Sequence, residues 1–307
     1  MYIIGENIHI ISPRVKKAIA ERDAKFFQDL ALRQVESGAQ ALDLNIGPQK
    51  KAGPEIMDWL VDTVREVTDV TLSFDTTNLA AIETGLKKVE RGKAIINSTS
   101  AEAERLEKVP PLAAEYGAKL IALTMGKGMI PVSAEARVEI ALEKLIPRAL
   151  EVGLPVEDLI IDPLALTVVG CQEYCPECIE AVRTLKFAWD PPPLVSIGLS
   201  NVSNRVPHGM RSLINRVYLV MLMAAGLDMA IADPLDEKLR ETIRIVEERD
   251  DSTPVGALYM KLYDRVAAME ELEPTDVDME DPEQVAIYKT VQVLLNKIIY
   301  TDSYLRL

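Results

Sequence analysis

The feature that most constrains the fold is a repeated alternation of short apolar runs with longer amphipathic stretches. Each run is too short for a helix and is apolar on both alternating faces, as in parallel strands that are covered on both sides. The runs are residues 2–7, 41–46, 70–75, 94–99, 119–125, 158–164, 194–200 and 229–234. They predict eight parallel strands.

The stretches between these runs have the periodicity of helices. The first covers residues 12–38 and begins with Ser12 and Pro13, a pair typical of a helix N-terminus. The prolines at 110–111 and at 147 predict a break or kink in their helices. After the seventh strand we expect a helix that begins near Arg211.

Eight strand–helix units in about 250 residues have the size and rhythm of a TIM barrel. A doubly wound open sheet is the alternative, but the even spacing and the lack of a glycine-rich phosphate loop favour closure. We therefore predict an α/β chain folded as one (β/α)8 barrel domain over residues 1–307. An acidic insertion with one helix is expected at 250–285, followed by a helix at 283–300 that packs back on the barrel.

Charge and cysteine content narrow the partners and the compartment. The chain has 34 basic and 48 acidic residues, a net charge of −14, and no basic stripe that would attract nucleic acid or an anionic membrane. No apolar run reaches the roughly 18 residues that span a bilayer, and Met1 is not followed by a signal-peptide pattern. Three clustered cysteines suit a reducing compartment, so a cytoplasmic location is expected.

Acids, amides and serines end nearly every predicted strand. The carboxyl ends of barrel strands form the functional face, so these side chains are expected to share one rim. Helix capping and turn formation are the alternative explanation for any one of them, but several lie within or at the end of a strand. The strand-end residues are Glu6, Asn7, Asp43, Asn45, Asp75, Asn97, Ser98, Asp162, Ser200, Asn201 and Asp233.

A rim of acceptors and amides suits a flat heterocycle rich in N–H groups. A carboxylate accepts two parallel N–H bonds from an amino-pyrimidine edge, and an amide can both donate and accept. The same set does not suit a phosphate. It also lacks the His/Cys/carboxylate cluster of a catalytic zinc, so no bound metal is expected.

Five short motifs occur in order at barrel-like spacing. They are "DLNIGP" (43–48), "SFDTTN" (73–78), "INST" (96–99), "IDPL" (161–164) and "GLSNVS" (198–203). With them the chain resembles the methyltetrahydrofolate:corrinoid protein methyltransferases, relatives of the folate module of cobalamin-dependent methionine synthase and of dihydropteroate synthase. The resemblance covers roughly residues 1–245 and resumes at "LLNKIIYTDSYL" (294–305).

The resemblance implies roles for the strand-end residues. Asp75, Asn97 and Asp162 would hold the pterin ring, and Asn201 would reach N5, the nitrogen that carries the methyl group. The other predicted binding residues are Glu6, Asp43, Asn45, Ser200 and Arg211, of which Ser200 and Arg211 would support the site or face the partner.

The resemblance also implies the reaction and its partners. Tetrahydrofolate or 5-methyltetrahydrofolate would be the substrate, the cobalt of a corrinoid on a separate protein would exchange the methyl group, and the chain would form a homodimer. N5 is a poor leaving group, so a hydrogen bond from Asn201 would stabilise the transition state. Asp75, Asn97 and water would supply the proton. Either direction of transfer is compatible with this site.

Three other interpretations of the sequence compete with the methyltransferase. Dihydropteroate synthase would need a basic group where "GLSNVSNR" (198–205) offers amides. Cys171, Cys175 and Cys178 have the spacing that holds an iron–sulfur cluster in radical enzymes, but they follow the sixth strand rather than the first. A folate carrier or an inert barrel is the non-enzyme interpretation. His9 and His208 fall on the same face, and we expect no chemical role for either.

Overall fold

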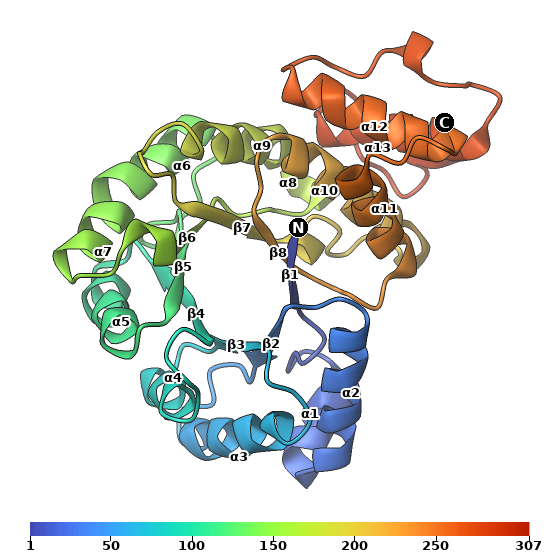
Figure 1. Ribbon diagram of the computed structural model, residues 1–307. Helices are drawn as coiled ribbons and strands as arrows, with labels where there is room; N and C mark the ends of the chain where they lie inside the picture. The colour runs from blue at the N-terminus through green and yellow to red at the C-terminus, as the bar shows by residue number, and fades with distance from the viewer. Residues whose placement is uncertain (307) are drawn as a thin grey trace.

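Eight parallel strands form a closed barrel in the computed structural model, which describes residues 1–306. This confirms the predicted (β/α)8 fold. The strands are β1 (Tyr2–Gly5), β2 (Ala41–Asn45), β3 (Thr71–Asp75), β4 (Ala94–Ser100), β5 (Lys119–Leu123), β6 (Leu159–Asp162), β7 (Leu194–Gly198) and β8 (Met229–Ala232). Each pairs with the next, and β8 pairs with β1 from Met229 opposite Tyr2 to Ala232 opposite Gly5. Figure 1 shows the resulting ring of strands inside a ring of helices.

The helices that surround the barrel pack their apolar faces on the outside of the strands. They are α1 (Pro13–Glu21), α2 (Ala24–Glu36), α3 (Gly53–Arg65), α4 (Leu79–Leu86), α5 (Ala103–Tyr116), α6 (Ala134–Ile140), α7 (Ile146–Glu151), α8 (Val168–Cys171), α9 (Tyr174–Leu185), α10 (His208–Ala224) and α11 (Glu237–Glu248). No helix within residues 1–306 is both long and apolar enough to cross a membrane.

The single helix expected over residues 12–38 is wrong: the segment forms two helices. Arg22 adopts a left-handed conformation (φ 53°) and ends α1. Asp23 then begins α2, because its side chain accepts a hydrogen bond from the backbone N–H of Phe26. Pro13 opens α1 as expected, but the Ser12 side chain makes no capping hydrogen bond.

Of the break or kink expected at Pro110 and Pro111, the break does not occur, since α5 continues through both prolines to Tyr116. A proline cannot donate to the carbonyl four residues earlier, so Leu106 and Glu107 lose their helical partners. Arg148 of α7 replaces both: its Nε lies 3.2 Å from the Leu106 carbonyl and an Nη lies 3.3 Å from that of Glu107. At the second proline site, a π-helical segment at 141–145 (η1) precedes α7, which has Pro147 in its first turn.

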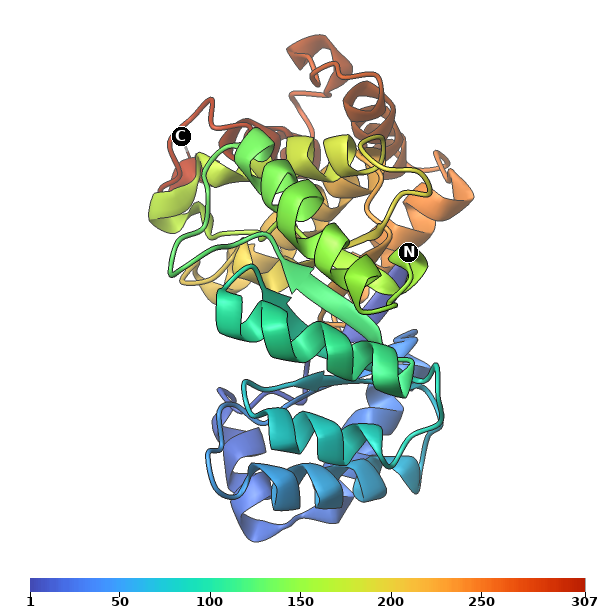
Figure 2. The same cartoon turned by 90° about the vertical axis from the view of Figure 1, so that its left-hand side faces the viewer.

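The chain after α11 forms two helices that pack outside the barrel against α10 and α11. They are α12 (Pro254–Ala267) and α13 (Pro282–Leu294), with a short 3-10 turn η4 (Pro274–Asp276) between them. Both views place this segment on the side away from α3 and α4 (Figures 1 and 2). The helix expected within 250–285 is α12, and the helix expected at 283–300 is the shorter α13, which ends at Leu294.

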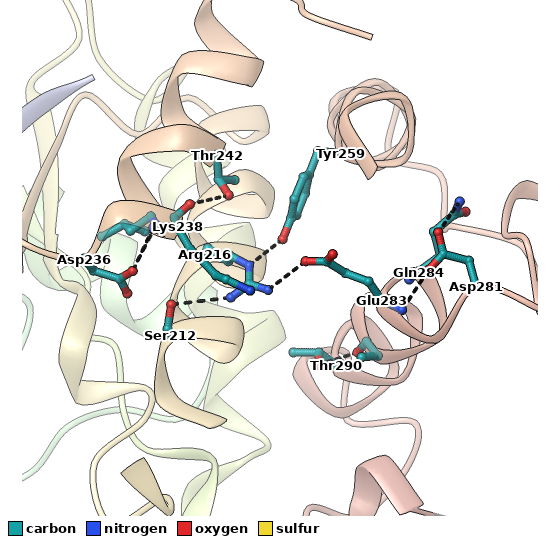
Figure 3. Close-up of polar contacts among 12 residues, drawn as sticks. Ser212, Arg216, Asp236, Lys238, Thr242, Tyr259, Asp281, Glu283, Gln284 and Thr290 are labelled. Atoms are coloured by element: carbon teal, nitrogen blue, oxygen red, sulfur yellow. Dashed lines mark hydrogen bonds and ion pairs between the residues drawn. The ribbon is translucent and has the colours of Figure 1, made fainter. Parts of the chain in front are cut away.

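Two buried polar residues of the barrel bind this C-terminal segment. Arg216 of α10 donates to the Tyr259 hydroxyl of α12 (2.8 Å) and pairs with Glu283 of α13 (3.5 Å), as Figure 3 shows. Gln172, which follows α8, donates to the carbonyl of Val293 (3.0 Å) and accepts from the backbone N–H of Tyr300 (2.7 Å). The segment is therefore joined to the barrel by specific hydrogen bonds as well as by apolar packing.

Candidate functional site

Three predicted site residues lie side by side at the carboxyl ends of neighbouring strands. The strand register pairs Asn45 with Asp75 and Asp75 with Asn97. Paired residues of parallel strands share a face, and the Asn45 amide donates to the Asp75 carboxylate. The β4 ladder shifts by one residue immediately after Asn97. Asn45, Asp75 and Asn97 therefore form one continuous polar arc.

Asp43 lies one layer deeper and supports this arc from below. It precedes Asn45 by two residues, so it occupies the same face of β2, and it is only 2% exposed. One of its carboxyl oxygens accepts from the Ser73 hydroxyl (2.6 Å) and from the Asn97 amide (3.1 Å). The Asn97 side chain is thereby held through its nitrogen, and within residues 1–306 its carbonyl oxygen accepts no hydrogen bond.

The two carboxyl groups of this cluster, Asp43 and Asp75, both have raised pKa values. Burial, with the nearby Asp75 charge, raises the pKa of Asp43 well above its usual range. Burial also raises the pKa of Asp75, to about 6, against the hydrogen bonds from Asn45 and Asp43 and the Arg105 charge, which lower it. Both carboxyl groups therefore hold a proton more tightly than a free aspartic acid does, and Asp75 is mostly ionised at neutral pH.

Asp162 ends β6 on another part of the rim and is 5% exposed. One of its oxygens accepts from the backbone N–H of Leu164 at 2.7 Å. Burial raises the pKa of Asp162 to about 7, against the lowering effects of that hydrogen bond and of the Arg137 charge. The rim thus holds a second carboxyl group that is partly protonated near neutral pH.

Glu6 and Ser200 meet where β1 and β7 flank β8. The Ser200 hydroxyl donates to the Glu6 carboxylate at 2.5 Å. Burial raises the pKa of Glu6 to about 7; the Asp233 charge also raises it, whereas the Ser200 bond and Arg211 lower it. Arg211 itself donates to the Ser203 hydroxyl (3.2 Å). It lies inside α10, which begins at His208 rather than near Arg211 as expected.

Asn201 ends a 3-10 turn, η3 (Leu199–Asn201), and is exposed. Within residues 1–306 its side chain makes no hydrogen bond, in contrast to the amides of Asn45 and Asn97. A Cβ at Gly198 would lie 2.9 Å from the Asn201 amide nitrogen, so glycine is needed there for the amide to keep its place. The structure therefore presents Asn201 as a free donor and acceptor.

The predicted residues do not form one hydrogen-bonded set. Asn45 bonds to Asp75 and Asn97 to Asp43, and Ser200 bonds to Glu6. Within residues 1–306 the side chains of Asp162, Asn201 and Arg211 bond to none of the other predicted residues. Sequence reasoning missed Ser73, although its position two residues before Asp75 places it on the same face. It also missed Arg137, because nothing in the pattern of its helix distinguishes a buried arginine from a surface one.

The three cysteines lie at the end of α8 and within α9. Cys171 is half-buried, while Cys175 and Cys178 are buried in α9. Burial raises the pKa of Cys178 to about 11, so it remains a thiol at neutral pH. Among residues 1–306 there is no group of three or more His, Cys, Asp or Glu side chains arranged to hold a metal ion.

This arrangement can bind a flat, nitrogen-rich ring and can donate or accept one proton. Carboxylates and amide oxygens accept N–H groups, and the free amide of Asn201 can donate to a ring nitrogen. Carboxyl groups with pKa values of about 6 and about 7 can take up or release a proton near neutral pH.

Comparisons with known proteins agree with this chemistry. A family model described as pterin binding enzyme matches residues 12–233. A methylcorrinoid:tetrahydrofolate methyltransferase of Eubacterium limosum is 28% identical over 249 residues, which are 79% of this chain and 89% of that protein. A methionine synthase of Mycobacterium tuberculosis is 29% identical over 289 residues, 87% of this chain. This chain spans only 24% of the synthase.

Solved structures of dihydropteroate synthase share the fold. The Thermus thermophilus enzyme superimposes with a TM-score of 0.58 at 19% identity, over 80% of this chain and 92% of the other. A Yersinia pestis structure gives 0.56 at 17% identity, over 81% and 93%. At these identities the likeness concerns the fold alone.

Proposed function

Because this chain belongs to the pterin-binding enzyme family, we propose that it transfers a methyl group between N5 of a tetrahydrofolate and a corrinoid. The corrinoid is carried by a partner protein, and its cobalt accepts or supplies the methyl group. The observation that carries the proposal is the rim itself. It combines fixed carboxyl and amide acceptors with the amide of Asn201, whose side chain makes no hydrogen bond to the rest of residues 1–306.

The pterin ring binds through its N–H edge to Asp75, Asn97 and Asp162. The Asn97 carbonyl oxygen is free because its nitrogen is held by Asp43 (3.1 Å). Asp162 has one oxygen bonded to Leu164 and the other free for the substrate. Glu6, Asp43, Asn45, Ser200 and Arg211 hold these groups or line the surrounding rim.

Asn201 is the group proposed to act on N5. When the methyl group leaves, the electron pair of the C–N bond remains on N5. A hydrogen bond from the Asn201 amide becomes stronger as that charge develops, which lowers the barrier. N5 then takes a proton. Burial and the nearby Asp75 charge raise the pKa of Asp43, and a network of Asp43, Asp75, Asn97 and water is the proposed route for the proton.

The direction of transfer and the partner are further parts of the proposal. The name of the Eubacterium limosum relative supports transfer from a methylcorrinoid to tetrahydrofolate, as in a demethylase system. Methionine synthase supports the use of methyltetrahydrofolate. The same rim lowers the barrier in both directions. A homodimer and a cytoplasmic location remain predictions of the sequence.

The test is to mix the protein with 5-methyltetrahydrofolate and a reduced corrinoid, free or on a candidate partner protein, and to follow loss of the folate methyl group. The reverse reaction starts from methylcobalamin and tetrahydrofolate. Turnover in either direction supports the proposal. Tight folate binding with no turnover on any corrinoid protein would instead indicate a carrier. Formation of dihydropteroate from a pterin pyrophosphate would indicate the synthase.

Substitution of Asn201 by Ala separates catalysis from binding. We expect kcat to fall by about 10²- to 10³-fold, as when one transition-state hydrogen-bond donor is removed, while the Kd for methyltetrahydrofolate changes little. Asn204→Ala is the matched control, since Asn204 is an exposed asparagine in the same loop. Equal losses of affinity and rate in Asn201→Ala would contradict the proposed role.

A further inference from the structure

Arg137 is the largest fully buried side chain in residues 1–306, and it lies behind the Asp162 turn. It comes from the last turn of α6, where a charged residue would normally face solvent. Its Nε donates to the carbonyl of Pro131 (3.0 Å), and its guanidinium lies over the Tyr174 ring at 5.5 Å from the ring centre. Burial of a guanidinium is costly in free energy unless its N–H groups and its charge find good partners.

The remaining donors of Arg137 are directed to the turn that follows β6. One Nη lies 3.4 Å from the carbonyl of Leu164. The other is buried and has no hydrogen-bond partner in residues 1–306. An arginine with an incomplete set of partners is a poor stabilising element in itself.

Leu164 is the residue that needs this support. Its φ of 70° lies in the left-handed region, which is strained for a residue with a side chain. Two polar contacts hold it there: its N–H donates to Asp162 and its carbonyl faces Arg137. The same N–H fixes one oxygen of Asp162 and leaves the other toward the rim.

We infer that Arg137 is a positioning residue for the substrate-binding carboxylate Asp162, acting through the left-handed turn at Leu164. It holds the carbonyl of the turn, the N–H of the turn holds the carboxylate, and its charge favours the ionised carboxylate that accepts N–H groups. This inference rests on the proposed function only in that Asp162 is taken to bind the pterin.

Electrostatics around Asp162 agree with this role. Arg137 from α6 lowers the pKa of Asp162, which burial otherwise raises to about 7. The Cys178 thiol of α9 also faces Asp162, but burial raises its pKa to about 11, so it is neutral where Asp162 titrates. Loss of the Arg137 charge therefore moves the Asp162 titration to higher pH.

The experiment compares Arg137→Gln, which keeps a donor but removes the charge, with Arg137→Lys, which keeps the charge. We expect Arg137→Gln to weaken methyltetrahydrofolate binding about tenfold at pH 7 and to shift the pH midpoint of binding upward. Arg137→Lys should keep a pH midpoint close to that of the wild type. Unchanged affinity and midpoint in a folded Arg137→Gln protein would overturn the inference.

The variant Leu164→Gly provides a second test, in which the turn itself is changed. Glycine adopts a φ of 70° without strain, so the turn should depend less on Arg137. Arg137→Gln should then cost a smaller factor in affinity in the Leu164→Gly background than in the wild type. Equal factors in both backgrounds would show that Arg137 does not act through the turn.

A separate readout keeps this inference distinct from the proposed function. The pKa of Asp162 can be measured by carbon-13 NMR of its carboxyl group, assigned with Asp162→Asn, and it needs no substrate. If the wild type binds no folate, the proposed function fails while this titration still tests Arg137. A pKa of Asp162 that is the same in Arg137→Gln and in the wild type would count against it.

Discussion

The pKa values of the acidic side chains at the rim of this barrel differ from those of acids on the surface. Glu6, Asp75 and Asp162 each hold protons more tightly than a free carboxyl group, and burial is the first cause in each case. A surface acid such as Asp69 shows the opposite behaviour, because the Lys93 ammonium lowers its pKa. The raised pKa values of Glu6, Asp75 and Asp162 identify carboxyl groups that are buried at the rim although their ionised forms destabilise the fold.

The stability of Asp162→Asn should depend on pH relative to the wild type. Because the pKa of Asp162 is raised from 3.8 to about 7, its contribution to the free energy of unfolding is fully present below about pH 4 and is lost as pH rises through about 7. Asparagine can still accept from Leu164 and carries no buried charge. We expect the variant to be more stable than the wild type at pH 8, by on the order of 2–4 kcal/mol, and similar at pH 4.

Urea unfolding at the two pH values measures this difference. Asp251→Asn is the control, because Asp251 is exposed and its replacement should have little effect at either pH. A gain that is the same at pH 4 and pH 8 would mean that the effect does not come from titration of Asp162.

The site residues that lie on strands could be predicted from the sequence, because the strand pattern fixes their positions. Asp43, Asn45, Asp75 and Asn97 follow from strand ends and a period of two, and the register brings them together. Asn201 follows from its place at the end of the seventh strand, but its proposed role at N5 comes from the resemblance alone. Arg137 could not be predicted, because its burial depends on a proline carbonyl and a turn far along the chain. Their roles in binding remain proposals.

At the scale of elements, α5 shows how a tertiary contact can replace a missing helical hydrogen bond. Two adjacent prolines leave the carbonyls of Leu106 and Glu107 without N–H donors, and Arg148 supplies both. The rule that proline disrupts a helix correctly predicted the loss of the two backbone hydrogen bonds. It did not predict that α5 continues through both prolines. The helix break at Arg22 was missed for the converse reason, since a local left-handed residue interrupted a continuous apolar pattern.

Replacement of Arg148 by Met should therefore destabilise the protein by about 1–3 kcal/mol, since both carbonyls lose their donors. The effect should shrink when Pro110 and Pro111 are changed to Ala, because the helix then supplies its own N–H groups. Chemical denaturation of the single, double and combined variants gives the coupling energy.

Glu151→Ala is the matched control for this cycle. It removes only the exposed ion pair between Arg148 and Glu151, so a loss below about 1 kcal/mol is expected. If Arg148→Met costs the same with and without the prolines, Arg148 contributes through packing rather than through the two carbonyls.

At the scale of the whole molecule, the segment after α11 completes the cover of the barrel. Helix α10 is buried through most of its length, and α12 and α13 pack on it. Arg216 spans this contact and reaches both helices (Figure 3). The segment therefore contributes to the stability of the barrel as well as to its outline.

A chain that ends at Asp250 should lose more than about 10 °C in Tm, since it exposes the apolar face of α10 and leaves Arg216 without Tyr259 and Glu283. Thermal unfolding and binding of a hydrophobic dye measure this. A truncated chain with an unchanged Tm and no dye binding would show that the segment is an independent accessory.

Tyr259→Phe tests the same contact in the full chain. Removing one partner of a buried guanidinium should cost about 1.5–3 kcal/mol. Tyr263→Phe on the same helix is the control, since the Tyr263 hydroxyl makes no hydrogen bond in residues 1–306.

The pairing of β1 with β8 has a consequence for how the protein is made in a cell. Tyr2 cannot meet Met229 until almost the whole barrel has left the ribosome. Until then the growing sheet has two open edges, each able to pair with another chain. Synthesis of this protein therefore includes a long interval during which chaperones and proteases compete for an unfinished ring.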